Sequence, residues 1–254
     1  MAHVAVVFVV FCLLSSATYI FNDWRDIEAD RLNPTKRERP LAAGTVAVAP
    51  ALVLMLALYA AAVGIGLLAQ FSGPLWVLLG AYVAINLGYS LGLKHVAVVE
   101  LFCVASGFVI RFFAGVVELG VTASPWIVSA TAMGALLIVS AKRRADIVNR
   151  RDPGEMRRSL QGYNLPFLDS VVTGLTGGTL VVYLLFCVSD YAETRYGQRV
   201  MLTAIPVAMG LLRFQQIVFV EGGGEQPTDL LFEDRFLLAT LACFALMFAY
   251  FLYF

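Results

Sequence analysis

The chain has 254 residues, of which 60% are hydrophobic and only 14% are charged, and its mean hydropathy is +0.80. A soluble domain is usually about half apolar and about a quarter charged, so this composition argues against an ordinary water-soluble protein and indicates a surface that faces lipid. The formal net charge is zero, which by itself identifies no partner.

Several segments are apolar over the roughly 20 residues that a membrane-spanning helix needs. They are residues 2–21, 48–70, 74–93, 97–119, 124–141, 166–188, 199–218 and 236–254. The runs are continuously apolar and do not alternate, which disfavours a transmembrane β-barrel. The sequence therefore predicts an all-α, polytopic transmembrane bundle of eight helices, forming a single domain over residues 1–254.

The first apolar segment differs from a secretory signal peptide because it lacks a basic start and a small-residue cleavage site, so we expect a retained helix. With eight spans, the connections 22–47, 94–96, 142–165 and 219–235 fall on one side of the membrane and carry most of the Lys and Arg residues. The other side holds only Arg195 and Arg199. The excess of basic residues predicts that the charged side is cytoplasmic and that both termini lie outside.

The first charged connection begins "NDWRDIEADRLNPTKRERPLAAG", residues 22–44. If the first helix continues past Phe21, then Asp23, Asp26 and Asp30 form one stripe, with Asn22 one turn before Asp26. Carboxylates one turn apart repel each other, so the helix gains nothing from this pattern alone. Mg²⁺, in contrast, favours one or two carboxylates together with water and substrate phosphate. The stripe therefore indicates a site for Mg²⁺ carrying a diphosphate.

Basic residues follow the acidic stripe at once. Pro34 ends the helix and turns the chain, and Lys36, Arg37 and Arg39 come directly after it. Lysine and arginine beside a carboxylate stripe are suited to hold both a metal and phosphate oxygens. The alternative is a solvated helix end in which the acidic residues pair with neighbouring arginines.

These 23 residues are similar to the first aspartate-rich motif of the UbiA superfamily of intramembrane prenyltransferases. That motif reads N-D-x-x-D-x-x-x-D, followed by K-R-x-R-P and a small-residue-glycine ending. The resemblance implies that Mg²⁺ is the cofactor, with Asn22, Asp23, Asp26 and Asp30 as metal ligands, the three aspartates as catalytic residues, and Lys36, Arg37 and Arg39 as phosphate-binding residues. The superfamily fold has one span more than this chain, so we expect that a helix is missing at the N-terminus or that this member is short.

The second charged connection, "SAKRRADIVNRRDPGEMRRSLQGY" (residues 140–163), is basic. Asp146 is the one carboxylate near its start, among Lys142, Arg143 and Arg144, and Lys142 can share a helix face with it. In the aromatic prenyltransferases of the superfamily, the corresponding motif is aspartate-rich and supplies a second metal site. A basic motif instead suits substrates with more phosphate than the metal can neutralise, because Arg and Lys bind phosphate oxygens by charge-assisted hydrogen bonds.

This pattern, with Ser159, Leu160 and Tyr163 downstream, resembles the phosphoribosyl-transferring branch of the superfamily, as do "YSLGLK" (89–94), "GFVIRFFAG" (107–115) and the segment 219–235. The resemblance implies transfer of 5-phosphoribosyl from phosphoribosyl pyrophosphate to a polyprenyl (decaprenyl) phosphate in the bacterial plasma membrane, for synthesis of a cell-envelope arabinose donor. It also implies a set of substrate-binding residues, Tyr89, Lys94, Lys142, Arg143 and Asp146, the last standing where the branch has glutamate.

Several alternatives stay open. The chain could instead prenylate an aromatic or other lipophilic acceptor, or serve without catalysis as a lipid-phosphate transporter or scaffold. The segment 219–235, with Glu221, Asp229 and Asp234, is either a lid or a hydrated connector, and Arg111 either faces the bundle interior or pairs with one of two glutamates, Glu100 or Glu118. We expect no nucleic-acid partner, and the sequence leaves the oligomeric state open, a homo-oligomer included.

Overall fold

The computed structural model describes residues 2–33, 36–149, 162–224, 230 and 233–253, and all regular elements among them are helices. Eight of the described helices are long and apolar enough to cross a membrane. They are α1 (Ala2–Arg25), α3 (Val48–Leu68), α4 (Gly73–Leu91), α5 (Val99–Leu119), α6 (Pro125–Val148), α7 (Leu165–Cys187), α9 (Ala204–Phe219, extended by the preceding 3₁₀ turn Gln198–Thr203) and α11 (Arg235–Tyr253). The predicted all-α, polytopic membrane bundle is confirmed.

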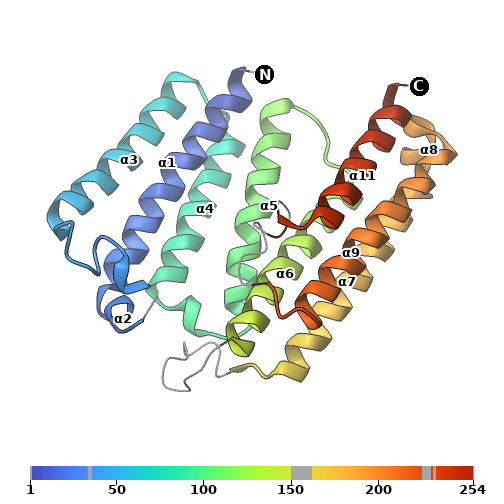
Figure 1. The fold of residues 1–254 in the computed structure, drawn as a ribbon. Coiled ribbons are helices and arrows are strands. Elements are labelled where there is room, and N and C mark those ends of the chain that lie inside the picture. Colours follow the sequence, from blue (N-terminus) through green and yellow to red (C-terminus); the bar gives the residue numbers. More distant parts are fainter. Residues whose placement is uncertain (1, 34–35, 150–161, 225–229, 231–232, 254) are drawn as a thin grey trace. The chain divides into compact units, whose positions relative to one another are not determined.

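The chain divides into two compact units, Met1–Ala123 and Ser124–Phe254. The first contains α1, α3, α4 and α5, drawn from blue to green in Figure 1, and the second contains α6, α7, α9 and α11 with the short α8 (Asp190–Tyr196). The expectation of a single domain over residues 1–254 stays a prediction.

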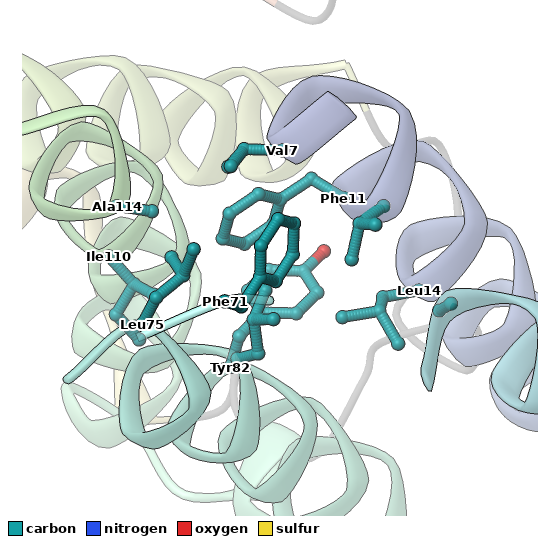
Figure 2. Packing of buried hydrophobic residues seen from close by; sticks show 11 residues of the cluster. Val7, Phe11, Leu14, Phe71, Leu75, Tyr82, Ile110 and Ala114 are labelled. Atoms are coloured by element: carbon teal, nitrogen blue, oxygen red, sulfur yellow. The ribbon is translucent and has the colours of Figure 1, made fainter. Parts of the chain in front are cut away.

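The core of the first unit forms along one apolar stripe of α1. Val7, Phe11 and Leu14 follow the helical repeat and are each at most 6% exposed. They pack against Tyr82 of α4 and, on α5, Ile110, as Figure 2 shows. The rings of Phe11 and Tyr82 meet edge-on with their centroids 5.3 Å apart, a favoured aromatic geometry. This stripe fixes the rotation of α1, and therefore the direction that its polar residues face.

The core of the second unit joins all four of its long helices. It contains Leu137 and Ala141 of α6, Val172 of α7, Phe214, Ile217 and Val218 of α9, and Leu237 of α11. Ala141 lies one residue before the charged segment of α6, so the packed core extends to the start of that segment.

Two helices run past the ends of their apolar segments. α1 continues to Arg25 and α6 to Val148, although the apolar runs end at residues 21 and 141. Both extensions carry the charged motifs, so these motifs begin on rigid helical ends. Charged residues are tolerated there because the backbone keeps its helical hydrogen bonds, for example Asp26 N to Asn22 O at 3.0 Å.

The α3–α4 pair depends on a glycine at close approach. A Cβ at Gly66 would lie 2.7 Å from the Trp76 ring and 3.0 Å from the Phe71 ring, whereas one at Gly64, on the same helix, would meet nothing within 4 Å. We expect Gly66→Ala to destabilise the protein by about 1–3 kcal/mol through overpacking, and Gly64→Ala to leave it unchanged or slightly more stable. Thermal unfolding midpoints (Tm) in one detergent measure both. Equal Tm values for the two variants would contradict the close packing.

Candidate functional site

The aspartate stripe crosses a break between two helices. α1 ends at Arg25, Asp26 adopts φ −102° and ψ 6°, and α2 (Ile27–Leu32) begins directly after it. Backbone hydrogen bonds continue across the break, from Asp26 N to Asn22 O and from Asp30 N to Asp26 O, at 3.0 and 2.7 Å. The polar side chains of this segment, Asn22, Asp23, Asp26 and Asp30, are called the aspartate cluster below.

Arg39 joins the two ends of the aspartate cluster. Its Nη1 donates to Asp23 Oδ1 at 2.8 Å and to Asp30 Oδ2 at 2.9 Å. The chain returns to the cluster through a short 3₁₀ turn, Lys36–Glu38, and Arg39 follows this turn directly. Asp30 is only 4% exposed, so its charge is removed from water and depends on this partner. The two carboxylates therefore converge on one nitrogen atom.

The end of α4 contributes a second cation. Lys94 lies in the 3₁₀ turn Leu93–His95, is 5% exposed, and donates from Nζ to Asp26 Oδ1. One turn earlier, Ser90 Oγ donates to Asn22 Oδ1 at 3.2 Å. Tyr89 is half-buried beside Ser90. The "YSLGLK" segment thus contacts the cluster through Ser90 and through Lys94, one of its two predicted site residues.

The two remaining basic residues of the first motif lie in the 3₁₀ turn before Arg39. Lys36 is half-buried and Arg37 is exposed. The turn is held to the end of α2 because Lys36 N donates to Asn33 Oδ1 at 3.1 Å and Arg37 N donates to Asn33 O at 2.9 Å. All predicted site residues of the first unit therefore lie around the aspartate cluster; their roles stay predictions.

In the second unit, the basic motif divides into residues with different surroundings. Arg143 is 6% exposed, and its Nη1 donates to Asp146 Oδ2 at 2.9 Å. Lys142 is exposed. The partner recorded for Asp146 is thus Arg143, three residues away, and not Lys142, which the spacing also allowed.

Arg144 ties three helices together. Its Nε donates to Asp169 Oδ1 of α7 at 2.6 Å and its Nη1 to the carbonyl of Val218 on α9 at 2.7 Å. The guanidinium carbon also lies 4.7 Å from the centre of the Phe219 ring, within range of a cation–π contact. The sequence analysis named Arg144 as a neighbour of Asp146 without giving it a role, and it overlooked Asp169. The available signal was a lone carboxylate in an otherwise apolar helix.

The rest of the second motif is described only in part. Arg150, Arg151, Asp152, Arg157, Arg158, Ser159 and Leu160 lie outside the described residues, as does Asp229 of the later acidic segment. Tyr163 is 8% exposed, and its ring stacks on Phe167 with centroids 5.9 Å apart at the start of α7.

Arg213 of α9 forms ion pairs with residues near both ends of the acidic segment 219–235, an arrangement called the Arg213 clasp below. It donates to Glu221 Oε1 at 2.5 Å and to Asp234 Oδ2 at 2.7 Å. Asp234 also accepts from the backbone N–H of Leu237, at 2.8 Å, in the first turn of α11. Whether the segment acts as a lid is untested, but two of the three acidic residues singled out for that role are engaged in this clasp.

Residues of the aspartate cluster have the chemistry that Mg²⁺ requires. Carboxylate and amide oxygens are hard ligands, and the three carboxylates now contact the guanidinium of Arg39 and the ammonium of Lys94. Among the described residues, no group of three or more His, Cys, Asp or Glu side chains lies close enough to hold a metal. The donor set therefore fits Mg²⁺ only if these two cations move and substrate oxygens complete the coordination.

The Asp26–Lys94 pair predicts a specific stability pattern. Asp26→Asn leaves the buried ammonium of Lys94 without a charged partner, which should destabilise the protein by about 3 kcal/mol. Replacing both, as Asp26→Asn with Lys94→Met, should recover most of this loss because no buried charge remains. Tm values of the wild type, both single variants and the double variant complete the cycle. Additive losses in the double variant would show that the pair is not coupled.

The Arg213 clasp predicts a dependence on pH. Hydrogen bonds from Arg213, assisted by the Leu237 N–H, hold the pKa of Asp234 below its ordinary value of 3.8. This carboxylate therefore stabilises the fold above its ordinary pKa, and the contribution is lost as pH falls through the depressed value. Asp234→Asn should lower Tm at about pH 7, and the difference from the wild type should shrink below about pH 4. The exposed Asp190, changed to Asn, is the control; a difference for Asp234→Asn that is constant with pH would contradict the assignment.

Comparison with known proteins identifies relatives along most of the chain. A family model described as the UbiA prenyltransferase family matches residues 1–221. A protein of Corynebacterium glutamicum named decaprenyl-phosphate phosphoribosyltransferase is 37% identical over 92% of this chain and 71% of its own length. Proteins of the same name from Mycolicibacterium smegmatis and Mycobacterium tuberculosis are 36% and 35% identical, each over 93% of this chain and over 76% and 77% of their own lengths.

Solved structures show the same fold. A UbiA homolog from Archaeoglobus fulgidus bound to DMAPP and Mg²⁺ superposes with a TM-score of 0.71 and covers 99% of this chain and 86% of its own. The structure of such a homolog bound to GPP and Mg²⁺ gives a TM-score of 0.72, with 99% and 87% covered. Sequence identity is 17% in both cases, so these likenesses establish the fold alone.

Proposed function

Because the chain belongs to the UbiA prenyltransferase family, we propose that it is an integral membrane enzyme that transfers the 5-phosphoribosyl group of phosphoribosyl pyrophosphate to a polyprenyl phosphate, releasing diphosphate. The observation that carries this proposal is the basic second motif, in which Lys142, Arg143 and Arg144 precede the single carboxylate of Asp146. The names of the relatives over more than nine-tenths of the chain support it. The product would serve as a precursor of a cell-envelope arabinose donor.

The donor diphosphate would bind at the aspartate cluster. Asn22, Asp23, Asp26 and Asp30 would hold Mg²⁺, which neutralises the diphosphate leaving group. Arg39 and Lys94 must then release the carboxylates that they now contact. Their charges remain beside the cluster and would bind diphosphate oxygens, together with Lys36 and Arg37 of the adjoining turn. The ligand-free ion pairs thus keep cations in place for the substrate.

The chemistry requires little beyond positioning and charge. Bond breaking at the ribose C1 develops oxocarbenium character, as in glycoside chemistry. The lipid phosphate is already an anion at neutral pH, so its oxygen attacks C1 without a strong general base. The side chains of this site therefore act by holding the reactants in line and stabilising the charge on the leaving diphosphate.

The second unit would bind the remaining phosphate. Lys142 is exposed and Arg143 donates to Asp146 at the start of the basic motif; both would contact the 5-phosphate of the donor or the phosphate of the lipid. Arg144, held by Asp169 and the end of α9, keeps this segment in place.

We place the site at the cytoplasmic face of the bacterial plasma membrane. The positive-inside rule puts the charged ends of α1 and α6 there. A lipid phosphate lies at the interface while its chain lies among the helices, and the soluble sugar donor arrives from the cytoplasm.

Prenylation of an aromatic acceptor is the alternative reaction in this family, and the solved relatives bind prenyl diphosphates with Mg²⁺. Such a reaction needs a second carboxylate group for metal. In residues 142–149 of the second motif, Asp146 is the single carboxylate and three basic residues precede it. This basic composition favours the phosphoribosyl reaction over aromatic prenylation.

The reaction is tested with labelled phosphoribosyl pyrophosphate and decaprenyl phosphate in detergent, with and without Mg²⁺. Asp23→Asn is a cleaner test than Asp26→Asn, because Arg39 keeps its contact with Asp30 and the buried Lys94 keeps its carboxylate partner. We expect labelled lipid from the wild type only with Mg²⁺, and a loss of about 100-fold or more in rate for Asp23→Asn. The matched control, Asp190→Asn, changes an exposed aspartate of α8 and should keep the wild-type rate.

Two results would reject the proposal. One is the absence of Mg²⁺-dependent labelled lipid from folded wild-type protein. The other is transfer of a prenyl chain to an aromatic acid under the same conditions, which would select the alternative reaction.

A further inference from the structure

A positive charge lies in the middle of a membrane-spanning helix of the first unit. Arg111 is near the centre of α5 (Val99–Leu119), within the apolar stretch "GFVIRFFAG". An ionised side chain at this depth is costly unless it meets a polar partner. The mechanism above does not use Arg111, so its partners need a separate account.

The partners of Arg111 in the structure are neutral. Its Nη2 donates to Tyr82 OH at 2.8 Å and to Ser15 Oγ at 3.1 Å, and these two hydroxyls share a hydrogen bond of 2.9 Å. The expected alternative of an ion pair with Glu118 is not realised, since that carboxylate lies 3.2 Å from His3 Nδ1. No ion pair of Arg111 is recorded among the described residues, and its charge is not balanced by its hydroxyl partners.

The contacts occupy only one corner of the guanidinium. Both hydrogen bonds come from Nη2, and no acceptor for Nε or Nη1 is recorded among the described residues. The aromatic ring of Tyr82 also contacts the guanidinium of Arg111, whose central carbon lies 5.0 Å from the centre of that ring. Tyr82 is itself 3% exposed and anchored in the apolar core, as Figure 2 shows. Both two-donor edges of a guanidinium include Nη2, so Arg111 would meet a phosphate oxygen through a single N–H of Nε or Nη1 and through its charge, which Tyr82 and Ser15 hold in position.

The depth of this cation indicates which phosphate it would meet. Ser15 lies eight residues before Asp23 on α1, which corresponds to about 12 Å of helix rise into the apolar span. Side chains on a helix lean toward its N-terminus, and α5 begins just after the turn that carries Lys94. Arg111 thus reaches from the membrane interior toward the aspartate cluster. A phosphate drawn to it would come from a lipid in the bilayer, and not from the soluble sugar donor.

We propose that Arg111, positioned by Tyr82 and Ser15, binds the phosphate of the polyprenyl phosphate acceptor and so selects a phosphorylated lipid over the corresponding alcohol. The inference rests on the proposed function for the identity of the lipid. It assigns the acceptor phosphate to the first unit, deeper in the span than the aspartate cluster, and leaves Lys142 and Arg143 for the 5-phosphate.

The first test is binding without the sugar donor, so that its outcome does not depend on catalysis. The protein in nanodiscs is titrated with decaprenyl phosphate, with decaprenol and with inorganic phosphate. We expect the wild type to bind the phosphorylated lipid about 10- to 100-fold more tightly than the alcohol, and millimolar inorganic phosphate not to compete. Arg111→Gln should reduce this preference to within about threefold, whereas Arg111→Lys should keep part of it.

The second test separates binding from a structural role. In steady-state assays, Arg111→Gln should raise the KM for decaprenyl phosphate about 10-fold or more, while the KM for phosphoribosyl pyrophosphate changes less than about twofold. Tyr82→Phe keeps the ring but removes the hydroxyl that orients Arg111, and should give an intermediate rise. Arg195→Gln, which changes an exposed arginine of α8, is the matched control, and the Tm of each variant is measured alongside.

The outcomes separate this inference from the proposed function. The inference is overturned if the wild type does not prefer the phosphorylated lipid, if Arg111→Gln keeps the preference, or if both KM values rise equally with a fall in Tm. If the wild type transfers no phosphoribosyl group but its lipid preference is present and depends on Arg111, the proposed function fails and the phosphate site stands.

Discussion

The contact on which the candidate site depends is the double hydrogen bond from Arg39 to Asp23 and Asp30. Three carboxylates within two helical turns repel each other, and one of them is almost fully buried. Arg39 and Lys94 offset this repulsion, and each comes from a segment outside the stripe. The same pairs keep the carboxylates converged. Under the proposed function, the arrangement that stabilises the fold would also prepare the cluster for metal and diphosphate.

In the second unit, the charged residues of the helix extension are mostly basic, and their like charges also repel each other. Its helix extension carries three consecutive basic residues, and two of them have carboxylate partners: Arg143 with Asp146, and Arg144 with Asp169. The partner recorded for Arg143 lies three residues away on the same helix. Arg144 instead joins α6 to α7 and to the end of α9. Neighbours in sequence thus have different structural roles, because one is paired within its helix and the other across helices.

Arginines at different depths illustrate the same principle. Arg213, near the end of α9, is neutralised by two carboxylates and fixes the acidic segment at both of its ends. Arg111 lies within a span and is held by two hydroxyls, which orient its charge without cancelling it. In a low-dielectric surrounding, an oriented and uncancelled charge interacts strongly with an anion. A mid-membrane arginine with neutral partners is therefore suited to bind a lipid phosphate, whereas a clasped one is suited to hold structure.

The sequence by itself determined the eight spans, the polar stripe of α1, the basic character of α6 and the family. These features are local: an apolar run of membrane length or a repeat of carboxylates is complete within one segment. Only the tertiary structure decided the pairings. Lys94 meets Asp26 across 68 residues, Arg144 meets the carbonyl of Val218 across 74, and Arg111 meets Ser15 across 96. Such contacts depend on which helices pack together and on their rotation, which the apolar core of each unit sets, and no spacing within a single helix encodes them.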